Sequence, residues 1–223
     1  MNNKNWKFAA YLTLAALGYA GHATAEVIDN TDIAFQFERF GAPETATYGQ
    51  TITVGSDNIL NSFSLFLFGR EGGSPLNLRG YVGGWDGLKA TEILYTSDVR
   101  TMGTEGEFIT ELAFNTGALS LVTGSKYVLF ISVSDLGPQA NSGYNMPGTF
   151  NTYAGGDFVY HDSQLDFASL TRETWDCTEC ENSDVAFVAT LSASPSGTVP
   201  EPGSLALLGL GLLGVGAARR KLA

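Results

Sequence analysis

Two neighbouring segments decide the fold class of this 223-residue chain: ILNSFSLFLF, from Ile59 to Phe68, and LNLRGYVGGW, from Leu76 to Trp85. Each is a short stretch of mainly apolar and aromatic residues, as expected for strands of a buried sheet. The segment between them, GREGGSP, is rich in glycine and marks a break in which the chain turns. The pattern therefore favours an all-β domain built from short strands.

Seven further segments share this character and are rich in aromatic and β-branched residues. They are Ile33–Phe40, Gln50–Val54, Glu92–Ser97, Glu107–Phe114, Lys126–Ser134, Asp157–His161 and Asp184–Ala193. Glycine-rich breaks separate them, and no helical periodicity longer than two turns competes with them. Nine short strands with turn signals predict an all-β fold, an antiparallel β-sandwich that is jelly-roll-like.

The first 25 residues have the organisation of a secretory signal peptide. Lys4 and Lys7 precede an apolar stretch, and Ala23-Thr24-Ala25 supplies the small residues of a cleavage site. We expect a signal helix at residues 1–25, export through the Sec machinery, and cleavage by signal peptidase after Ala25.

The other end of the chain carries an apolar run followed by three cations. The residues from Leu205 to Ala218 are all apolar or glycine, and as a helix they would reach about 21 Å, against about 30 Å for a bilayer core. With Gly203 and Ser204 this run predicts a short transmembrane helix at 203–218, with the cations cytoplasmic and the body on the far side of the membrane. The alternative is a buried core helix, but the run has no polar face.

The residues before this run carry a family resemblance. Val199-Pro200-Glu201-Pro202, an apolar run and the basic cluster Arg219, Arg220 and Lys221 together resemble the PEP-CTERM sorting signal of Gram-negative bacteria. The resemblance implies that exosortase, a membrane-embedded transpeptidase-like enzyme, removes the tail. The two prolines hold the backbone extended, which suits entry into a protease-like cleft.

The resulting domain boundaries are a signal peptide at 1–25, a β-sandwich at 26–193, a Pro/Gly/Ser-rich linker at 194–198 and a sorting signal at 199–223. The resemblance implies export across the inner membrane, transient anchoring there, and a final place at the cell surface or outside the cell. Much of Tyr48–Ala193 also resembles a recurring module of PEP-CTERM proteins that looks like a carbohydrate-binding jelly roll.

These features favour a non-catalytic surface or matrix protein that associates with exopolysaccharide in a biofilm and whose body is either a structural or a glycan-binding module. The alternatives are a glycan-active hydrolase and a permanently anchored adhesin. Outside the two termini the chain has seven basic and 22 acidic residues, so nucleic acid is not an expected partner.

Few residues are committed to catalytic chemistry. His161 is the only histidine after the expected cleavage site, which excludes a multi-histidine metal centre within one chain. A Ser-His-Asp triad would have to use His161, and the chain has no Gly-x-Ser-x-Gly motif. The ordinary interpretation is a histidine at a strand end, and we assign no catalytic residue.

Cys177 and Cys180 are separated by two residues in an acidic segment. In an oxidising compartment this spacing favours a local disulfide. The alternatives are a redox pair, which needs a following helix, and half of a metal site in a dimer.

Tyr81, Trp85, Asp86 and Tyr95 form the candidate glycan site, because three aromatic rings and a carboxylate flank the GGWDG turn. Sugar-binding sandwiches commonly stack a pyranose ring on an exposed aromatic side chain beside a carboxylate. The alternative is that these rings are core or turn packing.

Asp157, Asp162 and Asp166 form a second group, with oxygen atoms suited to Ca²⁺. Their spacing matches no EF-hand, and solvated loop acids are the alternative. We expect no other cofactor.

Overall fold

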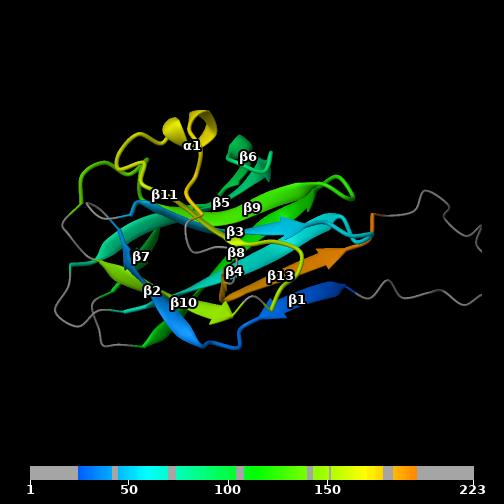
Figure 1. Ribbon diagram of the computed structural model, residues 1–223, viewed down its shortest axis with the longest axis horizontal. Coiled ribbons are helices and arrows are strands. Elements are labelled where there is room, and N and C mark those ends of the chain that lie inside the picture. The colour runs from blue at the N-terminus through cyan, green and yellow to red at the C-terminus, as the bar shows by residue number, and fades with distance from the viewer. Residues whose placement is uncertain are drawn as a thin grey trace, which may run out of the picture.

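The structure is a computed structural model that describes residues 25–41, 45–69, 74–103, 108–139, 143–150, 152–177 and 183–194. Within these residues the chain forms two antiparallel sheets and one short helix (Figure 1). The predicted signal peptide up to Thr24, residues 195–198 of the linker and the whole sorting signal lie outside them. In the described part of the chain, no helix has the length and apolar character needed to cross a membrane.

The first sheet has seven strands in the order β1-β13-β4-β10-β12, with β8 paired to β4 and β2 paired to β10. Its strands are β1 (Glu26–Asn30), β2 (Phe35–Phe40), β4 (Ile59–Phe68), β8 (Ile109–Ser120), β10 (Tyr144–Phe150), β12 (Ser183–Val185) and β13 (Phe187–Ser192). β1 is joined to β13 along its whole length, from the pair Glu26 and Leu191 to the pair Asn30 and Phe187.

The second sheet has six strands in the order β11-β3-β9-β5-β6, with β7 paired to β5. Its strands are β3 (Thr47–Thr53), β5 (Leu76–Trp85), β6 (Ala90–Thr96), β7 (Arg100–Met102), β9 (Lys126–Ser132) and β11 (Phe158–His161). The helix α1 (Ser169–Arg172) lies on the outer side of this sheet (Figure 1).

All nine segments predicted as strands contain strands, and β4 and β5 have the predicted bounds. The segment 184–193 was predicted as one strand but divides into β12 and β13, because Ala186 turns its N–H to the carbonyl oxygen of Pro147 at 2.8 Å. Three strands were not predicted: β1, β7 and β10. The two antiparallel sheets agree with the predicted sandwich, while the finer jelly-roll topology stays a prediction.

The space between the sheets is filled by side chains from both of them, and we call this layer the inner core. Phe63 and Leu65 of β4 and Phe187 of β13 meet Leu129 and Ile131 of β9, and all five are almost fully buried. Alternate residues of a strand point to opposite faces, so each strand contributes every second side chain to this layer. Burial of these apolar side chains is the main stabilising contribution to the sandwich.

The six-stranded sheet has a second buried layer on its outer face, which we call the outer core. It consists of Tyr81, Ala90, Val128, Phe130, Val159, Leu170 and Trp175. The last two belong to residues 162–177, which contain α1 and which we call the cap segment. The neighbours of the strand residues, such as Val82 and Leu129, belong to the inner core. This sheet is therefore buried on both faces.

A buried polar contact joins the two sheets. Asp184 of β12 accepts a hydrogen bond from Gln50 of β3 at 2.7 Å, and also from the backbone N–H groups of Thr152 and Tyr153, each at 3.0 Å. Burial raises the pKa of Asp184, and these three hydrogen bonds oppose the rise. The carboxyl group is fully buried, so its hydrogen bonds fix the position of β12 against β3.

Candidate functional site

The turn between β5 and β6 is where the sequence places its candidate glycan site. Asp86 begins the turn and is exposed, and its Oδ1 accepts hydrogen bonds from the N–H groups of Leu88 at 2.8 Å and Lys89 at 2.9 Å. These two hydrogen bonds hold the pKa of Asp86 below its usual value. An aspartate that bonds its own backbone in this way stabilises a tight turn. Asp86 therefore has a local structural role at this position.

Trp85 ends β5 and is half-buried against the cap segment. Its ring meets that of Trp175 edge to face, with 5.5 Å between the ring centroids and 82° between the planes. Trp175 also donates its backbone N–H to the carbonyl oxygen of Leu88 at 2.9 Å, and Lys89 Nζ donates to the carbonyl oxygen of Arg172 at 3.3 Å. The turn is thus a docking point for the cap segment, and only part of the Trp85 ring is open to solvent.

The two tyrosines of the predicted group do not share a surface with each other. Tyr81 is 1% exposed, and its ring is stacked on Phe130 in the outer core, with 4.9 Å between the centroids. Tyr95 packs against the inner core, and its ring lies edge to face with Phe63 at 6.3 Å. The prediction of one aromatic platform is therefore wrong for Tyr81, because its ring is enclosed and has no free face for a sugar.

A row of polar side chains crosses the outer face of the six-stranded sheet beside the aromatic rings. His161 of β11, Thr47 of β3, Ser132 of β9 and Arg79 of β5 are direct cross-strand neighbours. Directly paired residues share a face of an antiparallel sheet, so the four side chains lie side by side. We call them the polar row. Sequence reasoning missed it, because only the pairing register brings these ordinary residues together.

The middle of the polar row is a buried chain of hydroxyl groups. Thr47 Oγ1 lies 2.7 Å from Ser132 Oγ, which lies 2.7 Å from Ser134 Oγ. Ser163 of the cap segment joins them through a contact of 3.4 Å to Thr47 Oγ1. All four residues are buried. These hydroxyl groups satisfy one another, so this middle part of the row is stabilised by hydrogen bonds between uncharged groups.

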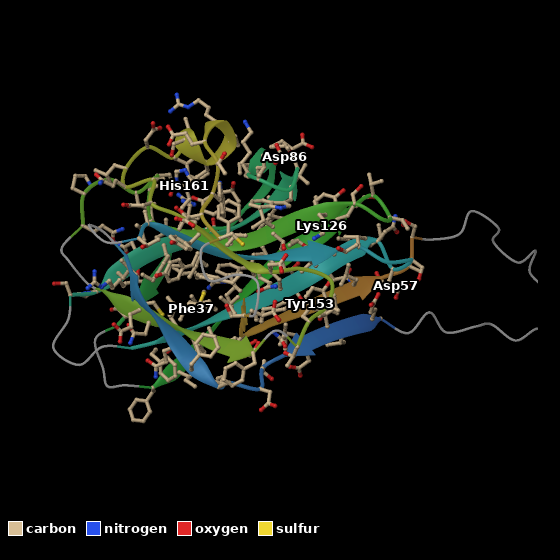
Figure 2. The ribbon with its side chains drawn as sticks, viewed as in Figure 1. Phe37, Asp57, Asp86, Lys126, Tyr153 and His161 are labelled. Atoms are coloured by element: carbon tan, nitrogen blue, oxygen red, sulfur yellow. The ribbon has the colours of Figure 1, made fainter. Side chains whose placement is uncertain are left out.

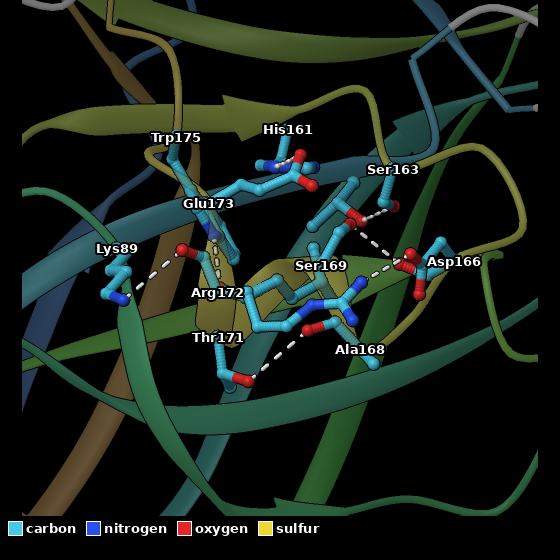
Figure 3. Close-up of polar contacts among 12 residues, drawn as sticks. Lys89, His161, Ser163, Asp166, Ala168, Ser169, Thr171, Arg172, Glu173 and Trp175 are labelled. Atoms are coloured by element: carbon cyan, nitrogen blue, oxygen red, sulfur yellow. Dashed lines mark hydrogen bonds and ion pairs between the residues drawn. The ribbon is translucent and has the colours of Figure 1, made fainter.

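His161 lies at one end of the polar row, under the cap segment (Figure 3). It is 6% exposed, and its Nε2 is 3.8 Å from Glu173 Oε2. Burial lowers the pKa of His161, while the carboxylates of Glu173, Asp162 and Asp166 act in the opposite direction. Within the described residues Nδ1 has no hydrogen-bond partner. This differs from a hydrolase triad, in which an acid orients the histidine through a hydrogen bond to Nδ1.

The other end of the polar row carries an ion pair. Arg79 Nε is 3.2 Å from Asp135 Oδ2, and Arg79 Nη1 donates to the carbonyl oxygen of Ser97 at 2.6 Å. Both side chains of the pair are about a quarter exposed. Burial, and then the neighbouring Asp135, raise the pKa of Tyr81 far above its usual value. The hydroxyl group of Tyr81 therefore stays protonated beside this ion pair.

The three aspartates considered for Ca²⁺ occupy different settings. Asp166 is paired with Arg172 at 2.6 Å, as Figure 3 shows. Asp157 leads into β11, and Asp162 is exposed in the cap segment. Over the described ranges no three His, Cys, Asp or Glu side chains gather as metal ligands. The arginine that neutralises Asp166 makes it a poorer cation ligand.

A groove of about 510 Å³ lies between β7 and β8, where the edges of the two sheets meet. It is lined by Val99–Met102 and Thr110–Ala113. Arg100 reaches across it and donates to the carbonyl oxygen of Ala113 at 3.4 Å, and Glu111 accepts a hydrogen bond from Ser64 at 2.7 Å. Sequence reasoning missed this groove, because β7 is only three residues long and carries no strand signal.

The remaining predicted residues lie at or beyond the edge of the described chain. Cys177 is disulfide-bonded. Its predicted partner Cys180 is outside the described residues, as is the sorting signal with Val199, Pro200, Glu201, Pro202, Arg219, Arg220 and Lys221.

Comparison with solved structures gives distant similarities. One is to the cysteine protease and lectin-like domains of Cwp84, a surface layer associated protein of Clostridium difficile, with 10% identity and a TM-score of 0.39 over 71% of this chain and 36% of that chain. Another is to infectious bursal disease virus, Gt strain, with 15% identity and a TM-score of 0.36 over 99% of this chain and 53% of that chain. This chain thus spans about a third to a half of those chains.

Comparison with curated proteins gave no match. The end of the chain, residues 198–221, matches the PEP-CTERM protein-sorting motif. This range contains the Pro-Glu-Pro tripeptide, the apolar run and the basic cluster. The motif indicates exosortase-dependent export, with exosortase as the processing partner and the cell surface or the extracellular space as the destination.

Proposed function

We propose that this chain is an exported, non-catalytic protein of the cell surface or extracellular matrix of a Gram-negative bacterium, anchored transiently in the inner membrane and then released by exosortase. The PEP-CTERM match at residues 198–221 carries the proposal. The signal-peptide pattern at residues 1–25 supports it, because it places the body on the same side of the membrane as the Pro-Glu-Pro tripeptide.

The test of this proposal is cell fractionation of two kinds of variant. Glu201→Ala, or neutral residues in place of Arg219, Arg220 and Lys221, should leave the precursor in the inner membrane, because each removes one part of the signal. Glu173→Ala removes an exposed acid of the body and serves as the control. Normal release of both sorting variants would refute the proposal.

Glycan association is the second part of the proposal, and the groove between β7 and β8 favours it. Arg100, Thr101 and Glu111 give it hydrogen-bonding groups suited to sugar hydroxyls. A glycoside hydrolase uses two carboxylic acids about 5–9 Å apart. Among the described residues that line the groove, Glu111 is the one acidic residue, which favours binding over hydrolysis. The exopolysaccharide of the producing cell, in its biofilm, is the proposed ligand.

Affinity electrophoresis against that exopolysaccharide compares the groove with the β5–β6 turn. If the groove binds, Thr101→Ala, which removes a hydroxyl group from an exposed edge strand, should abolish retardation. If the turn binds the glycan instead, Trp85→Ala should abolish retardation. Circular dichroism establishes that each variant is folded, and Val122→Ala, at a 64% exposed side chain outside both the groove and the turn, is the control. Equal mobility of the wild type with and without glycan would refute glycan binding and leave the sorting proposal intact.

A further inference from the structure

The two ends of the described body leave the sandwich at the same place. Glu26, the first residue after the expected cleavage site, pairs with Leu191 near the end of β13. The backbone N–H of Glu26 donates to Asp57 Oδ2 at 3.2 Å, and Ser194 Oγ donates to Asn58 Oδ1 at 2.7 Å. Consecutive residues of one loop therefore hold both ends of the body.

Hydrogen bonds between two loops fix this end of the sandwich. Asn58 Nδ2 donates to the carbonyl oxygen of Leu121 at 3.1 Å, and the N–H of Leu121 donates back to Asn58 at 2.8 Å. The N–H of Gly124 donates to the carbonyl oxygen of Val54 at 2.8 Å. We call the surface formed by Glu26, residues 54–58, residues 121–125 and Ser194 the terminal pole. Asp57 marks it in Figure 2, and His161 lies toward the opposite end.

The length of the linker between the body and the sorting signal limits how far the Pro-Glu-Pro tripeptide can lie from the terminal pole. Five residues, 195–199, separate Ser194 from Pro200. Fully extended they reach about 18 Å, at about 3.3–3.6 Å per residue. The ten residues of β4 alone reach about 33 Å along the sandwich. The linker is therefore too short for Pro-Glu-Pro to be held beside the opposite end of the body.

Beside the exposed Val122, two turns of the terminal pole consist of small residues. Gly55, Ser56, Thr123 and Gly124 are exposed at its surface. A Cβ atom added at Gly124 would meet no atom of the described residues within 4 Å, so the space beside this turn is open in that part of the chain. Small side chains allow a large neighbouring protein to approach the backbone closely.

We propose that the terminal pole is the surface that the body presents to the membrane-embedded processing enzyme while the tail is still attached. This rests on the exosortase processing proposed above. The short linker enforces this close approach. The opposite end of the sandwich, which carries the polar row, faces away from the membrane throughout processing.

The test is pulse–chase analysis of tail removal in full-length variants carrying a compact inserted domain. Insertion between Thr123 and Gly124, or between Gly55 and Ser56, should slow tail removal by about tenfold or more, because the linker no longer spans the distance to the enzyme. The matched control is insertion between Gly137 and Pro138, in the loop after the opposite end of β9, which should leave the rate unchanged. Protease resistance of the body identifies the variants that fold.

A second change completes the test. A Gly/Ser extension of about 15 residues after Ser196 should restore processing of the variants with an insertion at the terminal pole, since it lengthens the reach. Normal processing of both pole variants, or no rescue by the extension, would overturn the proposal. Glu201→Ala run in parallel separates the two ideas: its normal processing refutes sorting, whereas its block together with normal processing of the pole variants refutes only the orientation.

Discussion

The two sheets of the molecule differ in how many faces they bury. In the six-stranded sheet, β9 reads KYVLFIS and every residue after Lys126 is buried. In the seven-stranded sheet, β13 reads FVATLS and buried residues alternate with half-buried ones. The inner core covers one face of each sheet. Within the described residues, only the six-stranded sheet has a second buried layer, the outer core under the cap segment. The continuous burial of β9 thus results from side chains packed on both faces of its sheet.

This difference indicates that the cap segment is part of the folded core, although it contains only one turn of helix. Its Trp175 is 4% exposed and donates Nε1–H to the carbonyl oxygen of Leu170 at 2.8 Å. Its ring lies edge to face with Phe130 at 5.3 Å. Aromatic pairs of this geometry stabilise beyond the area they bury. The cap segment is therefore expected to unfold together with the sandwich.

Trp175→Ala should give the largest effect, because it opens a cavity in the outer core. The expected loss is about 3–5 kcal/mol in the free energy of unfolding, measured by urea denaturation. Phe150→Ala is the control on the other sheet. Its side chain is 67% exposed, so its removal should change the free energy by less than about 0.5 kcal/mol. Equal effects of the two substitutions would show that the outer core is not a core.

Asp184→Asn tests the contact between the sheets and should have an intermediate effect. Gln50 Oε1 accepts the N–H of Val185 at 3.0 Å, so its NH₂ group is fixed toward Asp184. An asparagine must turn its own NH₂ group toward this donor or toward the backbone donors at Thr152 and Tyr153. We expect a loss of about 1–3 kcal/mol by urea denaturation. Asp162→Asn, at an exposed position, is the control, and equal stability of the two variants would contradict this account.

The smallest effect concerns pH and the polar row. The folded state lowers the pKa of His161, so the unfolded chain binds its proton more readily. Stability from this group is complete above the unfolded pKa, about 6.5, and is lost as pH falls through that value toward the folded pKa. Thermal unfolding of the wild type between pH 7.5 and 5.5 should show this loss, and His161→Gln should reduce it. The same pH dependence in both proteins would exclude His161 as its source.

The strand pattern was predictable from the sequence except where a special contact overrides composition. The sequence predicts a break at the residues YNMPG of β10, because proline and glycine disfavour strands. Gly148 is required there by Phe35, whose ring would lie 2.5 Å from an added Cβ atom. The carbonyl oxygen of Pro147 accepts the N–H of Ala186, so the strand continues through the proline. Neither contact can be read from local sequence.

The candidate glycan site was less predictable, because sequence proximity does not say which face a side chain occupies. Val82 is the cross-strand neighbour of Tyr95 and lies in the inner core, whereas Tyr81 lies in the outer core. The cap segment that covers Tyr81 and meets Trp85 follows almost eighty residues later in the chain. Its position depends on long-range packing of Leu170 and Trp175, for which no local pattern exists.

The central claim, that the body is delivered and then separated from its tail, is tested most directly by intact-mass measurement of the protein recovered outside the cell. The account predicts a chain that begins at Glu26 and has lost everything beyond about Pro200, including Arg219, Arg220 and Lys221. The same measurement on the inner-membrane fraction should find the precursor with its tail. A released protein whose mass includes the basic cluster, or a full-length chain that stays in the inner membrane, would contradict it.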